Sequence, residues 1–454
     1  MDLSIVVLAA GQGTRMRSDL PKVLHPLAGW PMVRFVMDVA RSLEPTCLVA
    51  VVGHKAELVR QALGDEIRVV TQVEQLGTAH AVLQAGPAVA GLAKTVLVLY
   101  GDSPLIRPTT LHALLDHHHA SGAVLTLLSS QPGDPGGYGR IVREPATGRI
   151  LRVVEDREAT TEQRQIGEVS SGIFCFYDEW LWPAVAQVKQ RSGGELYLTD
   201  LVELAVQQGQ PVAAWPGEEL EAAGIDSRVK LARAEAEMRR RINERWMLAG
   251  VTLVDPATTY IEAGVEIGAG TTVWPGTSLQ GQTRIGHQCS IGPGALVRDS
   301  AIGDRCRVEL SVLEEAIMDS GSDIGPFSHL RKGAHLGVGS HVGNFGELKN
   351  SYLGPGAKMG HFSYLGDAKV GANANIGAGT ITCNFDGRQK HPTVIGDEAF
   401  IGSDTMLVAP VTVGDGARTG AGSVVTHDVP PHTVAYGVPA RVRAEPADEQ
   451  TEEK

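Results

Sequence analysis

Aliphatic residues recur at every sixth position through the second half of this chain. The series begins at Ile261 and continues through Ile267 and Val273, and glycine often follows the aliphatic residue, as at Gly286. Helices repeat every 3.6 residues and strands every two, so neither element explains this period. A six-residue repeat is typical of a parallel β-helix, in which three hexapeptides form one triangular coil and the aliphatic side chains point inward. We therefore expect a left-handed parallel β-helix of hexapeptide repeats over residues 251–454.

Two stretches interrupt this repeat, one near residues 309–323 and one at residues 381–394. The repeat resumes after each of them, so we expect both to be loops that extend out of an intact stack of coils. Such loops usually serve binding in solenoid proteins. The chain ends in a polar and acidic segment from Glu445 onward, which we expect to be a disordered tail.

The first half of the chain alternates short apolar runs with helical patterns. The apolar runs occupy residues 3–9, 47–52 and 95–100, and the helical patterns occupy residues 55–63, 77–85 and 108–118. This alternation predicts a Rossmann-like α/β domain with a mostly parallel sheet and helices on both faces. Ligands bind at the carboxyl ends of the strands in such sheets, and both the loop at 11–16 and Asp102 fall there.

A charged segment free of glycine and proline separates the two halves. Residues 227–248 contain many helix formers, and Gly250 follows them. We expect one linker helix at 227–250, between a domain of residues 1–226 and the β-helix of residues 251–454.

Charge, cysteine usage and hydropathy narrow the class of protein. The net charge of −12 and the lack of a basic stripe argue against a nucleic-acid partner. The five cysteines are scattered and never spaced as CxxC, which argues against a zinc site and disulfides and favours a reducing compartment. No apolar run is long enough to span a bilayer, so we expect no membrane insertion and a cytoplasmic location. We interpret the run His117–His119 as a solvated helix end rather than a metal site.

The glycine-rich loop of the first half is a candidate phosphate site. It reads LAAGQGTRM from Leu8 to Met16, and its small residues let backbone N–H groups approach phosphate oxygens. Arg15 within it and Lys22 in the segment PKVL add positive charge. Asp102 follows the third apolar run, where a carboxylate suits Mg²⁺, which prefers oxygen ligands and substrate phosphates. A glycine-rich loop taken alone is more often just a tight turn, and Asp102 taken alone would be better explained as a helix cap or a turn aspartate.

Together with QLGTAHA at 75–81 and YGDSPL at 100–105, these segments resemble the sugar-1-phosphate nucleotidyltransferases. Over nearly its whole length the chain resembles most closely the bacterial bifunctional family of N-acetylglucosamine-1-phosphate uridylyltransferase and glucosamine-1-phosphate N-acetyltransferase. The resemblance implies contacts with UTP and UDP-N-acetylglucosamine for Leu8, Ala9, Ala10, Gly11, Arg15, Lys22, Gln72, Gly77, Thr78, Tyr100, Gly101, Asp102, Gly139, Glu155, Ser170 and Asp226. Among these, it places the uracil and phosphates on the residues from Leu8 to Gly11 and on Lys22, Gln72, Gly77 and Thr78, and the sugar near Gly139, Glu155 and Ser170. It also implies that Mg²⁺ binds to Asp102 and Asp226.

Two of these positions depart from the family pattern. Ser170 stands where the family has asparagine, so we expect one sugar hydrogen bond to be shorter or water-mediated. Asp226, in the segment GIDSR, stands where the family has an asparagine that binds the metal. A carboxylate is a stronger magnesium ligand than an amide, so the metal role is kept for Asp226.

The segment GHFSYLGDA at 360–368 breaks the hexapeptide pattern and contains His361. In the family that the chain resembles, this histidine is the catalytic base that takes a proton from the amine of glucosamine-1-phosphate. Histidine suits such a proton transfer near neutral pH. The alternative is an ordinary exposed coil residue, as we expect for His287, His335 and His341.

The same resemblance implies the remaining contacts of the second site. Glucosamine-1-phosphate would contact Arg331, Lys349, Tyr364 and Asn375, joined by Lys390, and the co-substrate acetyl-CoA would contact Ala378, Asn384, Phe385, Ser403, Ala421 and Arg441. Phe385 replaces a family tyrosine and Pro392 replaces a family lysine, so the polar contacts of those two side chains are lost.

The sequence therefore predicts a bifunctional enzyme that acetylates glucosamine-1-phosphate and then transfers uridylyl from UTP to the product, releasing pyrophosphate. In the family that the chain resembles, the UDP-N-acetylglucosamine so made feeds cell-wall and surface-glycan synthesis. A triangular β-helix has flat faces that pack against symmetry mates, so we expect a homotrimer. Two alternatives remain: a monofunctional sugar-1-phosphate nucleotidyltransferase with a regulatory β-helix, and a non-enzymatic β-helix scaffold. Release of the CoA thiol in the presence of glucosamine-1-phosphate would distinguish them.

Overall fold

The computed structural model describes residues 2–191 and 194–443, which fall into two compact units. The first unit is Met1–Met238 and the second is Arg239–Lys454. Their boundary lies inside helix α8 (Arg228–Leu248), so the helix predicted between the two halves is present.

The acidic tail predicted from Glu445 onward lies outside the described residues. Among the described helices, none combines the length and apolar character needed to cross a lipid bilayer. The free thiols are those of Cys47, Cys175, Cys289, Cys306 and Cys383.

The first unit is built on a mostly parallel sheet. Its strands pair in the order β11 (Val212–Pro216), β7 (Leu125–Ser130), β10 (Val169–Tyr177), β6 (Thr95–Tyr100), β1 (Leu3–Ala9), β4 (Cys47–Val52) and β5 (Arg68–Thr71). β10 runs antiparallel to both neighbours, and β8 (Gly139–Arg143) and β9 (Ile150–Val154) extend the sheet from it. The three predicted apolar runs are confirmed as β1, β4 and β6, because buried side chains fill most of each.

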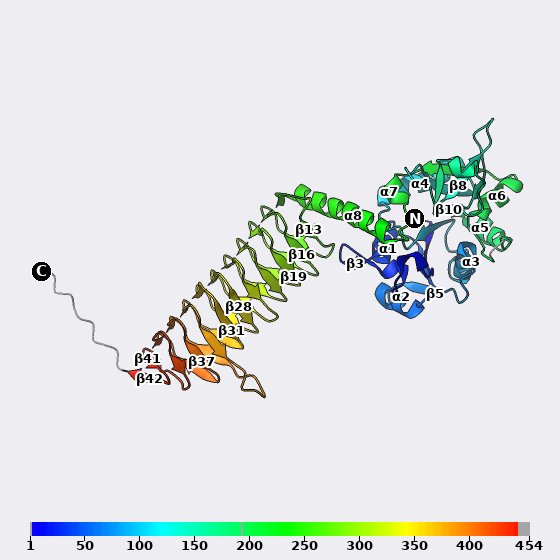
Figure 1. The fold of residues 1–454 in the computed structure, drawn as a ribbon. Coiled ribbons are helices and arrows are strands. Elements are labelled where there is room, and N and C mark those ends of the chain that lie inside the picture. Colours follow the sequence, from blue (N-terminus) through cyan, green and yellow to red (C-terminus); the bar gives the residue numbers. More distant parts are fainter. Residues whose placement is uncertain (1, 192–193, 444–454) are drawn as a thin grey trace. The chain divides into compact units, whose positions relative to one another are not determined.

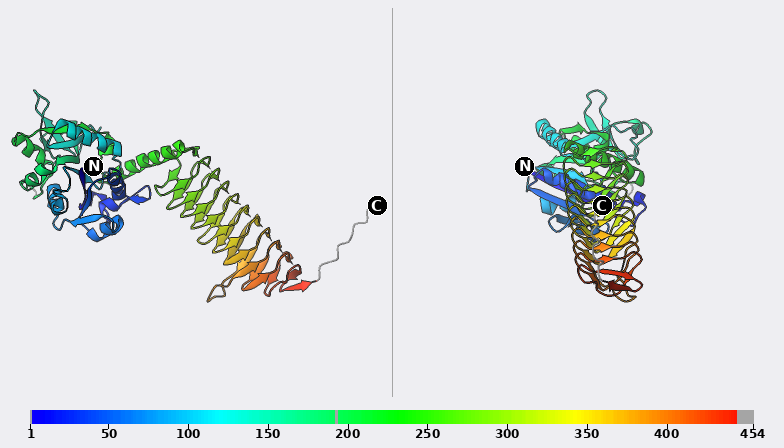
Figure 2. Two further views of the ribbon diagram at one scale, coloured as in Figure 1. Left: turned by 180° about the vertical axis from the view of Figure 1, so that it is seen from behind. Right: turned by 90° about the vertical axis from the view of Figure 1, so that its left-hand side faces the viewer.

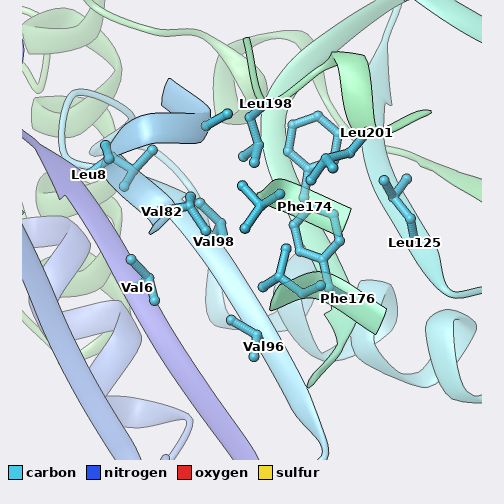
Figure 3. Packing of buried hydrophobic residues seen from close by; sticks show 14 of the residues in the cluster. Val6, Leu8, Val82, Val96, Val98, Leu125, Phe174, Phe176, Leu198 and Leu201 are labelled. Atoms are coloured by element: carbon cyan, nitrogen blue, oxygen red, sulfur yellow. The ribbon is translucent and has the colours of Figure 1, made fainter. Parts of the chain in front are cut away.

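Helices cover both faces of this sheet and produce two apolar cores. They are α1 (Met32–Ser42), α2 (Ala56–Leu63), α3 (Thr78–Val89), α4 (Pro108–Ser121), α5 (Asp178–Val185), α6 (Asp200–Gln207) and α7 (Glu219–Ala222). Side chains alternate along β1. Val6 and Leu8 therefore enter one core beside Val82 of α3, as Figure 3 shows. Ile5 and Val7 enter the other core, to which α1, α2 and α4 contribute.

The loop after β1 requires glycine at one position in particular. Gly13 has a φ of +69°, and a Cβ added to it would lie 2.5 Å from the Cβ of Lys22. The loop therefore lies directly against the turn η2 (Lys22–Leu24). Because no side chain separates them, Lys22 is brought next to the glycine-rich backbone at the carboxyl end of β1.

The strands of residues 251–443 fall into three sheets that form a parallel β-helix (Figure 1). The first sheet runs from β12 (Thr252–Leu253) to β41 (Val434–Gly437) and β42 (Ala440–Arg443), the second from β13 (Tyr260–Ile261) to β40 (Val424–Val425), and the third from β14 (Glu266–Ile267) to β38 (Val411–Val413). From β12 to β37, each strand pairs with the third strand after it along the chain, so three strands make one coil. The repeated aliphatic residues, such as Ile261, Val273 and Leu330, are buried inside the coils. This confirms the β-helix predicted from the hexapeptide period.

The predicted loop near residues 309–323 is wrong. Short strands occupy this stretch and continue the coils: β22 (Val312–Glu314), β23 (Ile317–Met318) and β24 (Asp323–Ile324). The buried residues Val308, Leu313 and Met318 follow one another at intervals of five residues instead of six. The repeat is thus shortened at two sides of a coil, not interrupted by an inserted loop.

The second predicted loop is present but is shorter than the sequence pattern indicates. It spans residues 384–392, between β34 (Ile381–Cys383) and β35 (Thr393–Ile395). A bridge between Phe385 and Lys390 pairs its two arms. The loop, drawn in orange, projects from the side of the stacked coils (Figure 2).

The run His117–His119 at the end of α4 is not wholly solvated. His118 is fully buried, its Nδ1 lies 2.9 Å from Thr126 Oγ1, and its ring centroid lies 4.5 Å from that of Tyr177. Burial, aided by the neighbouring histidines, lowers the pKa of His118 to about 4. The predicted solvated helix end was therefore wrong for His118, because α4 packs this residue against β7.

Candidate active sites

A cavity of about 320 Å³ opens where β1 and β6 reach their carboxyl ends. It is lined by Leu8, Ala9, Ala10, Gly11, Gln12, Lys22, Val23, Gln72, Gln75, Gly77, Thr78, Ala81, Tyr100, Asp102, Glu195 and Tyr197. Most residues predicted to contact the nucleotide are thus brought together from separate segments of the chain. Arg15 and Gly101 were also predicted there and do not line the cavity.

Two ion pairs place positive side chains at this site. Lys22 Nζ bonds to Oδ2 of Asp102, a carboxylate that is buried. Arg15 Nη2 lies 2.9 Å from Asp226 Oδ2, and the side chain of Arg15 is 64% exposed. The site therefore offers one fixed cation and one that solvent and ligands can reach, an arrangement suited to an anionic substrate.

The two predicted metal ligands lie next to each other in the fold although they are far apart in sequence. The N–H of Ile225 donates to the backbone oxygen of Asp102 at 2.8 Å, which holds the loop carrying Asp226 against Asp102. Mg²⁺ commonly takes one or two protein carboxylates and completes its shell with substrate phosphates and water. In the part of the chain that the structure describes, no group of three or more His, Cys, Asp or Glu side chains is placed to hold a metal. For an ion held by Asp102 and Asp226, a phosphate ligand and water would therefore have to supply the remaining ligands.

The residues predicted to contact the sugar do not line the 320 Å³ cavity. Gly139 and Ser170 are direct partners across β8 and β10. Glu155 follows β9 and lines a second cavity of about 230 Å³ together with Arg152 and Arg191. The structure thus groups the three predicted sugar contacts on the antiparallel part of the sheet.

β10 brings this group close to the first cavity. Gly172, two residues after Ser170, has a φ of +85°, and a Cβ on it would lie 2.8 Å from the ring of Tyr100. Tyr100 lines the first cavity. The predicted sugar position is therefore adjacent to the predicted nucleotide position.

His361 lies at an exposed corner of the β-helix, between β30 (Lys358–Met359) and β31 (Ser363–Gly366). The same corner of the following coils carries Ala378, Ser403 and Ala421. Backbone hydrogen bonds connect these turns, from Gly379 N to Phe362 O (2.7 Å), from Asp404 N to Ala378 O (2.6 Å) and from Gly422 N to Ser403 O (2.8 Å). The predicted base and three predicted acetyl-CoA contacts therefore lie along one edge of the coils.

Positively charged side chains gather on the face that contains β31. The register of β25 (His329–Leu330) with β28 (Gly346–Lys349) places Arg331 beside Lys349. Lys390 of the projecting loop and, to a lesser degree, Arg331 lower the pKa of Lys349, because like charges disfavour its protonated form. Tyr364 lies on the same face. Such a cluster of cations is suited to a phosphate group.

Other predicted contacts of the second site lie elsewhere in the chain. Asn375 begins β33 (Asn375–Ile376), which belongs to the sheet of β30 and not to that of β31. Arg441 lies on β42, in the hairpin with β41. Asn384 is buried and its Nδ2 donates to Asp367 Oδ2 at 2.6 Å, whereas Phe385 is exposed on the loop. Within one chain, the predicted contacts are thus divided between different faces.

Comparison with known proteins gives matches in both halves. The MobA-like NTP transferase domain matches residues 5–204, and the bacterial transferase hexapeptide family (six repeats) matches residues 392–427. Bifunctional protein GlmU of Exiguobacterium sibiricum is 46% identical and covers 95% of this chain and 96% of its own. The bifunctional protein GlmU of Enterococcus faecalis is 45% identical, and the match covers 97% of this chain and 96% of that protein. That of Geobacter sulfurreducens is also 45% identical, and the match covers 98% of each chain. The chain belongs to the bifunctional GlmU family.

Membership of the GlmU family confirms the family and the fold class predicted from the sequence. The relatives match the α/β half and the β-helix half within one chain. The match also confirms the predicted bifunctional enzyme, which combines a nucleotidyltransferase with an acyltransferase of the hexapeptide class. The two alternatives, a monofunctional nucleotidyltransferase and a scaffold, lose their support.

One segment that lines the first cavity of this GlmU family member was not predicted from the sequence motifs. Glu195 and Tyr197 line the cavity, yet neither belongs to a glycine-rich loop or a long apolar run. The residue between them is held by two backbone hydrogen bonds, from Leu196 N to Leu76 O (2.7 Å) and from Ala79 N to Leu196 O (2.9 Å). The alternation of apolar and polar residues in ELYLT was the available signal, because it indicates an extended segment with one side buried.

Proposed function

We propose that this chain makes UDP-N-acetylglucosamine in two steps. It transfers acetyl from acetyl-CoA to glucosamine-1-phosphate, and then uridylyl from UTP to N-acetylglucosamine-1-phosphate with release of pyrophosphate. The observation that carries the proposal is the presence of two separate candidate sites in one chain. The first unit has a cavity lined by Lys22 and Asp102. The second unit has His361 on a β-helix that also carries a cluster of cations. Similarity over the full length to proteins named bifunctional GlmU supports the same pairing.

In the uridylyl step, a phosphate oxygen of the sugar phosphate attacks the α-phosphorus of UTP. A new P–O bond forms while the bond to the pyrophosphate group breaks, and pyrophosphate leaves. Both reactants are anions, so Lys22 and Arg15 reduce the repulsion between them. Open space beside Gly11 lets backbone N–H groups reach phosphate oxygens. No general base is needed, because the attacking phosphate oxygen is already ionised.

We assign Asp102 and Asp226 as the protein ligands of Mg²⁺. When bound, the ion supplies positive charge that offsets the charge of the leaving pyrophosphate. Lys22 compensates the buried carboxylate of Asp102, while Arg15 and Lys230 compensate Asp226. Lys22 also lines the cavity proposed for the polyphosphate, so it is placed to offset part of the charge of the substrate.

In the acetyl step, the amine of glucosamine-1-phosphate attacks the carbonyl carbon of the acetyl thioester. His361 takes the proton of the amine as the C–N bond forms, and the C–S bond then breaks to release CoA. Arg331, Lys349 and Lys390 bind the phosphate of the sugar. The thioester arm lies along the corner of the following coils, beginning at Ala378.

We further propose that the chain is a homotrimer and that the acetyl site depends on it. His361 lies on an exposed corner, where one chain alone forms too shallow a cleft to exclude water from a thioester. Asn375 and Tyr364 lie on different faces of one chain, so a neighbouring copy is needed to bring both to one substrate. The loop at 384–392 projects from the coils and is the proposed lid. Sedimentation of the full chain should give a trimer, and a fully active acetyltransferase monomer would refute this proposal.

We place both steps in the cytoplasm. The support is chemical: all five cysteines are free thiols and are widely separated in sequence, as is usual in a reducing compartment.

Two assays on purified full-length protein test the proposed function. The protein should release pyrophosphate from UTP with N-acetylglucosamine-1-phosphate, and CoA thiol from acetyl-CoA with glucosamine-1-phosphate. Pyrophosphate release without CoA release would support the monofunctional alternative. Loss of both activities in a folded protein would support the scaffold.

A further inference from the structure

Thr199 directs its hydroxyl away from its own helix. It occupies the N-cap position of α6, where a threonine oxygen ordinarily accepts a hydrogen bond from an N–H group of the first turn. For this helix the structure gives no side-chain cap bond of that kind. The hydroxyl donates instead to Oε1 of Glu155 at 2.7 Å. We call residues 195–199, which end at this threonine, the strap.

The strap is held firmly by the residues just before Thr199. Leu198 is fully buried in the core shown in Figure 3, and its N–H donates to Thr78 Oγ1 at 2.9 Å. Leu196 is tied by two backbone hydrogen bonds to the segment around the start of α3. The strap thus connects the predicted nucleotide contact Thr78 with the predicted sugar contact Glu155, and it fixes the position of the threonine hydroxyl.

Glu155 has few other groups that could orient it. Its side chain is partly buried and lines the cavity of about 230 Å³. Arg191 lines the same cavity, but its Nη2 lies 2.8 Å from Oδ1 of Asp200. Arg152 also lines this cavity, and its Nη1 lies 3.7 Å from Oε1 of Glu203. The hydrogen bond from Thr199 therefore supplies a fixed donor to a carboxylate whose two basic neighbours are paired with other carboxylates.

We propose that Thr199 is a positioning residue for uridylyl transfer, which orients the carboxylate of Glu155 toward the sugar of N-acetylglucosamine-1-phosphate. This inference rests on the proposed function, in which Glu155 contacts the sugar. Without the hydroxyl the carboxylate is free to rotate, and its hydrogen bond to the sugar weakens. The hydrogen bond from Leu198 to Thr78 is donated by the backbone N–H, so it survives when the hydroxyl of Thr199 is removed. Affinity for the sugar phosphate should therefore fall, while affinity for UTP is kept.

The same hydrogen bond affects how sugar recognition depends on pH. Burial raises the pKa of Glu155, the bond from Thr199 lowers it, and nearby carboxylates raise it again. The charged groups around this carboxylate are Asp200, Glu158 and Glu195, with Arg152 and Arg191 in the same cavity. Loss of the hydroxyl raises the pKa further, so Glu155 becomes protonated at a higher pH. The acid limb of kcat/KM for the sugar phosphate should therefore move to higher pH.

The test compares Thr199→Val, which keeps the shape and removes the hydroxyl, with Thr199→Ser, which keeps the hydroxyl. Pyrophosphate release by the full chain is measured against each substrate in turn. Thr199→Val should raise KM for N-acetylglucosamine-1-phosphate about tenfold, as expected for the loss of a hydrogen bond that orients a charged group. KM for UTP should stay within about twofold, and Thr199→Ser should restore the sugar KM and the pH profile.

An unchanged sugar KM and pH profile in Thr199→Val, or an equal rise in both KM values, would overturn the inference. Release of CoA thiol and the melting temperature serve as controls for folding, and Thr199→Ala replaces Thr199→Val if the valine variant unfolds. Wild-type protein that releases no pyrophosphate contradicts the proposed function itself, and this inference with it. Normal wild-type activity together with an unaffected Thr199→Val variant contradicts the inference alone.

Discussion

Replacing Gly77 by alanine should damage both the stability of the first unit and uridylyl transfer. Gly77 precedes α3 with φ +108° and ψ −179°, a conformation that is nearly confined to glycine. A Cβ there would lie 2.5 Å from the backbone oxygen of Leu196 and 2.7 Å from its nitrogen. Rotation of a side chain cannot relieve an overlap with backbone atoms, so the strap has to move away from α3.

The structure lets the cost be divided into two parts. Forcing alanine into this region of backbone space costs about 1–3 kcal/mol. Moving the strap breaks the bonds from Leu196 N to Leu76 O and from Ala79 N to Leu196 O, each worth about 1 kcal/mol. We therefore expect Gly77→Ala to lower the free energy of unfolding by about 3–5 kcal/mol. Because Tyr197 lines the cavity from the strap, pyrophosphate release should fall as well.

Gly64 provides the matched control. It has a similar backbone conformation, φ +79° and ψ 167°, and a Cβ on it meets nothing within 4 Å. Gly64→Ala should therefore show the backbone strain without the loss of the strap contacts. In urea unfolding followed by tryptophan fluorescence, the free energy of unfolding of Gly77→Ala should be about 2 kcal/mol lower than that of Gly64→Ala. Equal destabilisation of both variants, or wild-type pyrophosphate release by Gly77→Ala, would refute the reasoning.

Three further predictions concern single side chains. His361→Ala should abolish CoA release and leave pyrophosphate release intact; measurable acetyl transfer at the wild-type rate would exclude it as the base. Asp102→Ala should remove magnesium-dependent pyrophosphate release while CoA release persists, and Asp226→Asn should be milder because it restores the ligand usual in the family; a magnesium titration of both variants checks this. His118 has a folded-state pKa lowered to about 4 from 6.5, so its neutral form favours folding, and this contribution, full above pH 6.5, is lost as the pH falls toward 4. Lowering the pH from 7 to 5 should therefore reduce the free energy of unfolding by about 2 kcal/mol in the wild type and by much less in His118→Gln. Urea unfolding at both pH values measures this, and an equal loss of unfolding free energy in the two proteins would contradict the prediction.

Much of the fold could be predicted from local patterns. The six-residue period matched neither a helix nor a single strand, and inward residues such as Ile261 are buried as it required. Continuous apolar runs gave the bounds of β1, β4 and β6, because strands buried on both faces need no polar alternation. Lys22 and Asp102 could be picked out because their motifs follow such strands closely, where ligands bind in α/β sheets.

Other parts of the candidate sites could not be read from local patterns. The segment of Asp226 is held beside Asp102 by the backbone bond from Ile225, and Thr199, before α6, meets Glu155, which follows β9. His118 lies among polar neighbours in sequence, yet α4 directs it to the interior. Nothing in the spacing of these residues along the chain predicts the contacts.

By itself the sequence determined the periods, the apolar runs and the chemistry available in each segment, because these depend on residues that are close together along the chain. Tertiary structure alone decided which segments meet. The coil around Leu313 stays closed at a five-residue interval because the coils on either side fix its register through backbone hydrogen bonds. The strap faces the cavity because Leu198 packs into the core and bonds to Thr78, far away in sequence. Such contacts depend on the path of the backbone between their partners, and no local pattern records that path.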